Sequence, residues 1–341
     1  MGLSSKLKST QTIPTHQQPT QQRSFSTEGT IQHNPPADPH HSEQAAPTDV
    51  YPAKQTSSFQ GPSSSASLIR QRLARLVTEN GLSAFYDGHR IEELSGRLSA
   101  LDAMSLARRW NLPTELVYDL YGLALYDICF FCDDSGSMIF EENGERVDDL
   151  RLILSRVAEI TSTFDEDGVV VRFMNSDVCG DFIRTGVEVE NLVASVPFHG
   201  MTPLGTNLER KVLEPMVVRQ VQAGSLAKPV LVIVITDGEP TGEPHDMVLT
   251  VIRNVVRFLK LAGYPGAALA VQFAQVGNDV RVQRFLAALD NDPEVGRNID
   301  CTSGFELEQE EFLRKGVDLT PELWLLKMCL GAIDRSYDEQ D

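Results

Sequence analysis

The sequence predicts an α/β fold built on a doubly wound, mostly parallel sheet with one antiparallel edge strand, preceded by a helical segment and a disordered N-terminal tail. Short continuous apolar runs, rich in β-branched and aromatic residues, recur after residue 125 and are typical of strands buried on both faces. Amphipathic stretches separate these runs. Strands that alternate with helices indicate a parallel sheet with right-handed crossovers and helices on both faces.

Residues 1 to 66 predict the disordered tail. Ser, Thr, Gln, Pro and His dominate this stretch, and its only leucines are Leu3 and Leu7. So little apolar surface cannot offset the entropy that the chain would lose on folding. Residues 67 to 125 then show helical periodicity, and we expect a helical segment that packs on the main domain. Its first helix carries Leu68, Leu73 and Leu76.

The main domain, which we place over residues 126 to 304, contains the predicted strands. The run Asp181 to Thr185 follows the second strand after a short turn, so we expect it to be the antiparallel edge. A final strand is predicted around Ile299 to Cys301. The four strands predicted as buried apolar runs are 126–132, 169–174, 230–235 and 269–276.

The predicted helices between the strands are amphipathic. A helix should start near Leu204, and Pro215 should end or kink it. Residues 305 to 341 predict a C-terminal helical extension. The apolar faces of two crossover helices and of this extension consist, in turn, of Val147, Leu150, Leu154 and Val157, of Met247, Val251, Val255 and Phe258, and of Leu323, Leu326, Leu330 and Ile333.

The net charge of the 341-residue chain is −18, and it falls entirely on the part predicted to fold, because the tail has four basic and four acidic residues. Such a surface repels nucleic acid phosphates and anionic lipid, which argues against both as partners. No run reaches the roughly 18 apolar residues that a membrane span needs. Five cysteines, an odd number, fit a reducing compartment, so we expect a cytoplasmic protein. Charge alone does not indicate the oligomeric state.

Polar side chains follow the predicted strands, and ligands of open α/β sheets bind where strands end at their carboxyl side. One loop, residues 133 to 137, reads Asp-Asp-Ser-Gly-Ser and follows the first strand. A second, residues 200 to 206, precedes the Leu204 helix, and a third, residues 236 to 240, follows the most apolar strand. Their candidate metal ligands are Asp133, Ser135, Ser137, Thr202 and Asp237.

These five side chains offer only oxygen atoms, a donor set that suits Mg²⁺, Mn²⁺ or Ca²⁺ and disfavours zinc or copper. In a loop that leaves a strand, alternate side chains can turn toward one point, and Gly136 permits a tight turn between the two serines. If the hydroxyls bind directly and an aspartate binds through water, the positive charge of the ion is incompletely quenched. The ion then attracts a carboxylate from a partner protein.

The three loops resemble the von Willebrand factor A domain family, which carries a metal-ion-dependent adhesion site. The resemblance covers about residues 126 to 304, and the stretches 133–138 and 319–341 are similar to the fungal intracellular members. It implies a doubly wound fold, a bound Mg²⁺ or Mn²⁺ and an Asp or Glu of a partner as the last ligand. The residues that match the family's motifs are Asp133, Ser135 and Ser137 in the first, Thr202 as the threonine and Asp237 as the final aspartate.

Other interpretations of these residues stay open. Thr206 is a second candidate for the threonine ligand, and Asp134 should face away from the site. The two aspartates could instead cap helices, although an unpaired charge at the end of an apolar strand would be costly. We expect a binding protein and no enzyme, because His199 alone does not supply a set of acid, base and nucleophile.

Two other functions are the alternatives, namely a scaffold in which the metal is only structural and, with less support, a metal-assisted hydrolase. The nearby Cys129 and Cys132 form a C-x-x-C pair, but we expect both to be buried core residues on a strand.

Overall fold

The computed structural model describes residues 62–165 and 167–338. Its centre is a sheet of six strands in the order β3-β2-β1-β4-β5-β6. Every neighbouring pair is parallel except β2 and β3, so β3 is the antiparallel edge strand. The predicted fold class is therefore confirmed. The strands are β1 Asp127–Cys132, β2 Val169–Phe173, β3 Cys179–Ile183, β4 Val230–Thr236, β5 Leu269–Gln275 and β6 Ile299–Thr302.

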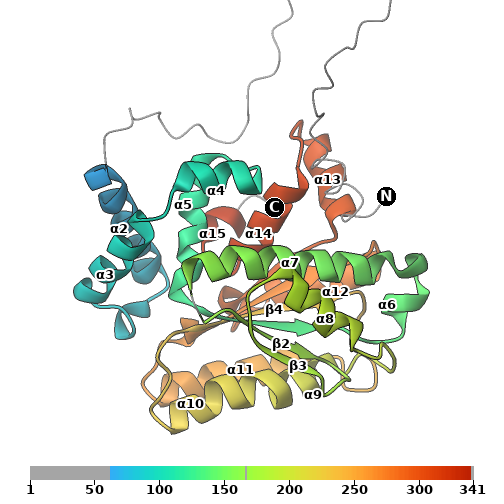
Figure 1. Cartoon of the computed structure of the whole chain (residues 1–341). Coiled ribbons are helices and arrows are strands. Elements are labelled where there is room, and N and C mark those ends of the chain that lie inside the picture. Colours follow the sequence, from blue (N-terminus) through green and yellow to red (C-terminus); the bar gives the residue numbers. More distant parts are fainter. Residues whose placement is uncertain (1–61, 166, 339–341) are drawn as a thin grey trace, which may run out of the picture.

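Helices cover both faces of the sheet (Figure 1). One face carries α7, Glu145–Phe164, and α8, Gly186–Ala194. On the other face lie α10, Arg219–Gln222, and α11, Met247–Leu261. The remaining crossover elements are α6 Ser137–Phe140, η3 Glu142–Gly144, α9 Leu204–Leu208, η4 Glu209–Val218, η5 Gly266–Ala268, α12 Val280–Asp290 and η6 Gly296–Asn298.

The helical segment before β1 packs on the same side of the sheet as α7 and shares one continuous core with the main domain. The phenol of Tyr86 donates to the carbonyl of Leu125 at 2.6 Å, and the indole of Trp110 meets the ring of Phe164 edge to face. The segment therefore does not form a separate domain. Its elements are α2 Pro62–Glu79, η1 Leu82–Ala84, α3 Gly88–Ser99, α4 Ala103–Trp110, α5 Thr114–Leu120 and η2 Tyr121–Leu125.

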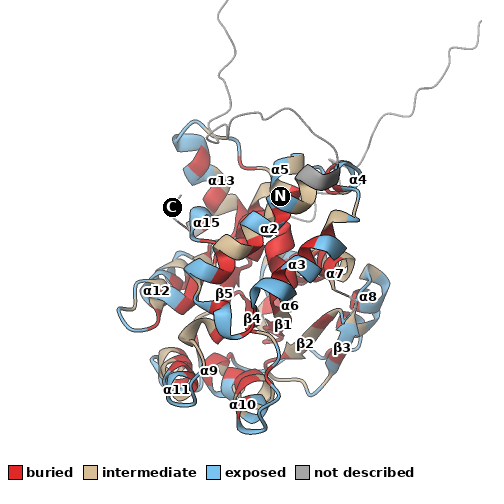
Figure 2. Cartoon of the chain, turned by 90° about the vertical axis from the view of Figure 1, so that its left-hand side faces the viewer, coloured by how far each residue is buried: buried red, intermediate tan, exposed pale blue. Residues whose placement is uncertain are grey.

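The C-terminal extension consists of α13, Phe305–Arg314, α14, Pro321–Leu330, and α15, Arg335–Asp338. Nearly all of α14 is buried, because it lies between the sheet and the helical segment, whereas a single apolar stripe was expected. Trp324 is buried, and its indole N–H donates to the carbonyl of Ser303 at 2.9 Å. Figure 2 shows that the buried residues run through the middle of the molecule.

Several boundaries differ from those predicted. The first helix begins at Pro62, inside the expected tail, and the rest of that tail, residues 1 to 61, lies outside the described residues. Leu68 is exposed, and Ile69 takes its place in the core beside Leu73. The side chains of β2 are alternately buried and half-buried, and Arg172 is one of the half-buried ones.

Pro215 was expected to end or kink the Leu204 helix, and it does not end it. Helical structure runs from α9 through η4 into α10, and Pro215 lies inside η4, which is a π-helix. A π-helical turn bonds residues five apart and is wider than an α-helical turn. Proline has no N–H to donate to the preceding turn, and the π-helical hydrogen-bonding pattern accommodates this loss. The helix therefore continues past Pro215.

Candidate functional site

The predicted ligands lie at the carboxyl edge of the sheet, where β1 and β4 are neighbours. In the ladder between these strands Cys132 is paired with Ile235, and the amide of Asp133 continues it by donating to the carbonyl of Ile235 at 2.8 Å. Asp133 and Asp237 therefore leave adjacent strands at the same level. Both are almost completely buried.

A continuous chain of hydrogen bonds connects four of the five predicted ligands. The Oγ atoms of Ser135 and Ser137 are 3.0 Å apart, and Ser137 Oγ donates to Asp237 Oδ1 at 3.0 Å. Asp133 Oδ1 accepts from the amide of Ser135 at 2.9 Å, and its Oδ2 accepts from Thr236 Oγ1 at 2.7 Å. The oxygens of two separate loops thus gather at one place. Neither aspartate caps a helix, which was the alternative interpretation of these residues.

The fifth residue, Thr202, borders the same place. A Cβ placed on Gly238, next to Asp237, would lie 3.6 Å from Thr202 Oγ1. The amide of Thr202 donates to Thr241 Oγ1 at 2.8 Å, and the amide of Thr241 donates back to the carbonyl of Thr202 at 2.9 Å. This pair of bonds fixes the threonine loop against the loop after β4.

Thr206, the alternative threonine, is exposed. Its amide and that of Gly205 donate to the two carboxylate oxygens of Glu243, at 2.8 and 2.6 Å. These contacts satisfy free N–H groups of the first turn of α9. The arrangement favours Thr202 as the threonine ligand.

Asp134 faces away from the gathered oxygens, as predicted, and it is fully buried. Its carboxylate accepts from the amides of Asn175 and Ser176, both at 2.7 Å, and the Asn175 side chain donates to the carbonyl of Met201 at 2.9 Å. The amide of Gly136 also donates to the carbonyl of Gly200 at 3.3 Å. Asp134 therefore braces the aspartate loop against the loops after β2 and before α9.

One residue of the site was missed by the sequence analysis. The guanidinium of Arg146 is buried, and its Nη1 lies 2.6 Å from Asp237 Oδ2 while its Nη2 lies 2.7 Å from the Glu141 carboxylate. Arg146 precedes Leu150 by four residues, and i and i+4 share a helix face. That spacing was the signal that it points inward.

The pKa values of the two aspartates are raised in the folded protein. Burial, and then the nearby charge of Asp237, raises the pKa of Asp133 to about 7. Burial also raises the pKa of Asp237, against the opposing effect of Arg146. Of these two buried carboxylates Asp237 pairs with Arg146, whereas Asp133 accepts from the amide of Ser135 and from Thr236 Oγ1. The negative charge of the two aspartates suits an added cation.

The donor chemistry fits a hard divalent ion. Over residues 62–165 and 167–338 no three His, Cys, Asp or Glu side chains cluster as a metal site, so an ion here would depend on hydroxyls as well as the two carboxylates. Hydroxyl and carboxylate oxygens are ligands of Mg²⁺ and Mn²⁺. Asp133, Ser135, Ser137, Thr202 and Asp237 could hold such an ion.

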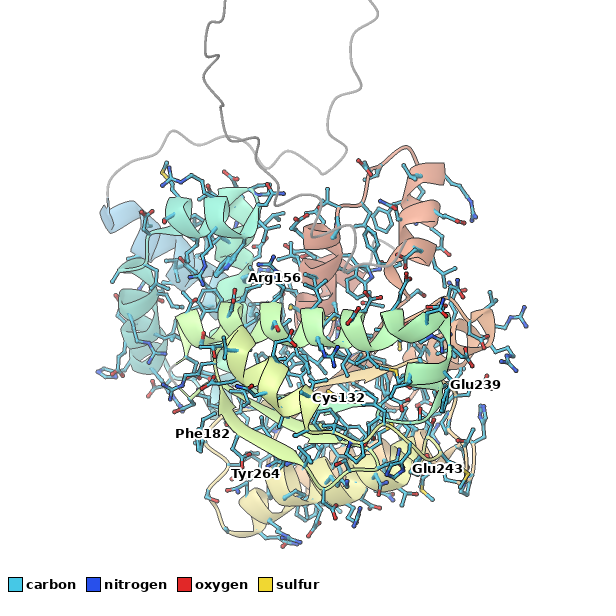
Figure 3. All side chains as sticks on the ribbon, turned by 45° about the vertical axis from the view of Figure 1, so that its right-hand side comes forward. Cys132, Arg156, Phe182, Glu239, Glu243 and Tyr264 are labelled. Carbon is cyan, nitrogen blue, oxygen red and sulfur yellow. The ribbon has the colours of Figure 1, made fainter. Side chains whose placement is uncertain are left out.

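The other polar candidates do not join this site. Cys129 and Cys132 are buried and free, as predicted, and burial raises the pKa of the Cys129 thiol to about 12. His199 is exposed, and its backbone amide donates to the carbonyl of Asp134 at 2.7 Å. Figure 3 shows Glu239 and Glu243 at the α6 end of the molecule and Phe182 toward the opposite end.

No family model matches the sequence, and no curated protein matches it. Among the described helices none is long and apolar enough to cross a membrane.

Proposed function

We propose that this chain is a metal-dependent protein interaction module. Asp133, Ser135, Ser137, Thr202 and Asp237 would hold Mg²⁺ or Mn²⁺, and an Asp or Glu of a partner protein would complete the site. The hydrogen-bonded chain of oxygens from Asp133 to Asp237, at the carboxyl edge of the sheet, carries this proposal. It also supports the resemblance to the von Willebrand factor A domain, since four of the five residues that match the family's motifs belong to this chain of hydrogen bonds.

Arg146 supports a binding role. Its guanidinium pairs with Asp237 and offsets the charge of that carboxylate, while Ser135 and Ser137 contribute no charge. A bound divalent ion supplies positive charge that attracts a carboxylate. The rim loops leave that charge accessible, because Ser137 and Gly136 are half-buried and not fully covered.

We also propose a cytoplasmic location. The cysteines at positions 129, 132, 179, 301 and 329 are all free, and Cys179 is exposed. Free thiols fit a reducing compartment.

Paramagnetic broadening with Mn²⁺ tests the site directly. With protein in excess over Mn²⁺, the ion should be bound by the protein. The bound Mn²⁺ should then broaden the proton signals of N-acetylaspartate amide and leave those of N-acetylasparagine amide unchanged. Asp133→Ala should abolish metal uptake. Asp177→Ala, which removes an exposed carboxylate outside the ligand loops, should not.

The outcomes separate the alternatives. Mn²⁺ uptake without any effect on the aspartate probe would indicate a structural metal and a scaffold role. Absence of uptake by the wild-type protein would refute the proposed site. Hydrolysis of an ester or phosphoester that needs Mg²⁺ and is lost in Ser135→Ala would favour the hydrolase.

A further inference from the structure

Two large apolar side chains stand exposed at the rim of the candidate metal site. Phe140, three residues after Ser137, exposes 84% of its surface, and Met201, next to Thr202, exposes 60%. Phe140 ends α6, which begins at the predicted ligand Ser137, and Met201 lies in the loop before α9 that carries Thr202. A single exposed apolar residue is ordinary on a protein surface, whereas two beside one polar site offer apolar area that a ligand of this site can bury.

Each of these side chains lies over a glycine. A Cβ on Gly136 would lie 3.6 Å from the ring of Phe140, and a Cβ on Gly242 would lie 2.8 Å from the terminal methyl of Met201. The amide of Gly136 donates to the carbonyl of Gly200, so the start of α6, which bears Phe140, is joined directly to the loop that bears Met201. The rim is thus one connected structure around the ligands, and we call Phe140 and Met201 the apolar rim.

Acidic groups lie on the same edge of the molecule. Glu141, which follows Phe140, is exposed and shares Arg146 with Asp237, and Glu239 lies two residues beyond Asp237. A ligand with several carboxylates would be repelled by these groups, because like charges at an interface are unfavourable. A ligand with one carboxylate, placed on the metal, would avoid that repulsion.

We propose that the partner presents a short segment in which one Asp or Glu is flanked by apolar side chains, the carboxylate binding the metal and the apolar neighbours packing on Phe140 and Met201. This inference rests on the proposed function, since the metal would anchor the carboxylate. The apolar rim then supplies specificity and additional affinity through buried aromatic and thioether surface. Truncation of both rim residues should weaken binding of such a segment at least about tenfold.

Selection from a displayed library of random 12-residue peptides tests the inference. The full chain is immobilised with Mg²⁺, and bound peptides are released with EDTA. We expect the released peptides to contain a single Asp or Glu next to Leu, Ile, Val, Met or an aromatic residue. The double variant Phe140→Ser, Met201→Ser should bind Mg²⁺ with unchanged affinity and lose at least about tenfold in affinity for these peptides.

The matched control is Leu261→Ser, which changes a side chain that is 90% exposed at the end of α11, away from the ligand loops. It should bind the selected peptides as the wild type does. The inference would be overturned if the selected acidic peptides had no apolar neighbour, or if the double variant bound the peptides as well as the wild type does. Either result would leave the proposed metal site unaffected. Failure to recover any EDTA-released acidic peptide would overturn the proposed function together with the inference.

Discussion

Arg146 and Asp237 form a buried ion pair at 2.6 Å that links a proposed metal ligand to a surface loop. The two oxygens of Asp237 have different partners, since Oδ1 accepts from Ser137 and Oδ2 pairs with Arg146. The other end of the guanidinium holds Glu141, just before a turn in which residues 142, 143 and 144 all have positive φ. The ion pair therefore orients Asp237 and also fastens the loop beside it.

Arg146→Gln should destabilise the metal-free protein by about 3 kcal/mol, because it leaves Asp237 as a buried charge without its partner. Added Mg²⁺ should restore more stability to this variant than to the wild type, since the metal would then be the main counter-charge of the site. Urea unfolding with and without Mg²⁺ measures both effects. Arg151→Gln, on the same helix but half-buried and paired with the exposed acids Asp148 and Glu190, should change little. Equal losses in the two variants would contradict the role of Arg146.

The raised pKa of Asp133 predicts opposite pH trends for the metal-free and metal-bound protein. Its pKa is about 7 in the folded protein, against 3.8 for an ordinary aspartate. The folded state therefore holds the proton more tightly, and this contribution to the stability of the metal-free protein is complete below about pH 4 and lost as the pH rises through 7.

Protons and metal should compete for this carboxylate, so Mg²⁺ affinity should rise between pH 5.5 and pH 8. The increase of the melting temperature on addition of Mg²⁺, measured at both ends of that range, tests the expectation. A pH-independent increase would argue that Asp133 does not contact the ion.

Asp134→Ala should weaken metal binding although Asp134 contacts none of the predicted ligand oxygens. The substitution removes the acceptor for the amides of Asn175 and Ser176, at a cost of about 1–3 kcal/mol in the free energy of unfolding. Asp134→Asn keeps one acceptor oxygen and should lose less. Calorimetric titration with Mn²⁺ and urea unfolding should rank wild type, Asn and Ala in that order, and an Ala variant with normal metal affinity would contradict the bracing role.

The sequence predicted most of the fold because buried parallel strands are continuous apolar runs. Strand β4 agrees with its predicted limits to within one residue, and every one of its side chains is buried. Strand β2 fits less well, because it lies beside the edge strand and only alternate side chains are covered. Pro215 does not end its helix, because the chain around it forms a π-helix, whose hydrogen bonding depends on neighbouring turns and not on the proline alone.

The sequence predicted those residues of the candidate site that directly follow strands. It did not predict the residue that reaches the site from a helix. Asp133 and Asp237 are found by their position after apolar runs. Arg146 comes from a helix and meets Asp237 across 91 residues, and sequence periodicity indicates only that it faces inward. Thr202 was preferred to Thr206 from the sequence, and the position of Gly238 beside the Thr202 hydroxyl agrees with that preference.

The attachment of α14 to the sheet depends on the absence of a side chain at Gly331. A Cβ at this position would lie 2.1 Å from Asp300 Oδ2 and 3.0 Å from Gln272 Oε1, and the next amide, that of Ala332, donates to the same Gln272 oxygen at 3.0 Å. Gly331 has ordinary helical angles, so the constraint is steric and not conformational. Gly331→Ala should therefore destabilise the protein by about 1–3 kcal/mol, because buried polar groups of β5 and β6 would have to move.

Gly96→Ala is the matched control, since Gly96 is exposed in α3 and a Cβ there would meet no atom within 4 Å. It should stabilise the protein by about 0.5–1 kcal/mol through helix propensity alone. Urea unfolding of the two variants should give changes of opposite sign. If Gly331→Ala proved as harmless as Gly96→Ala, α14 could not be held against Asp300 and Gln272 as closely as the structure shows, and the C-terminal extension would be a loosely attached element.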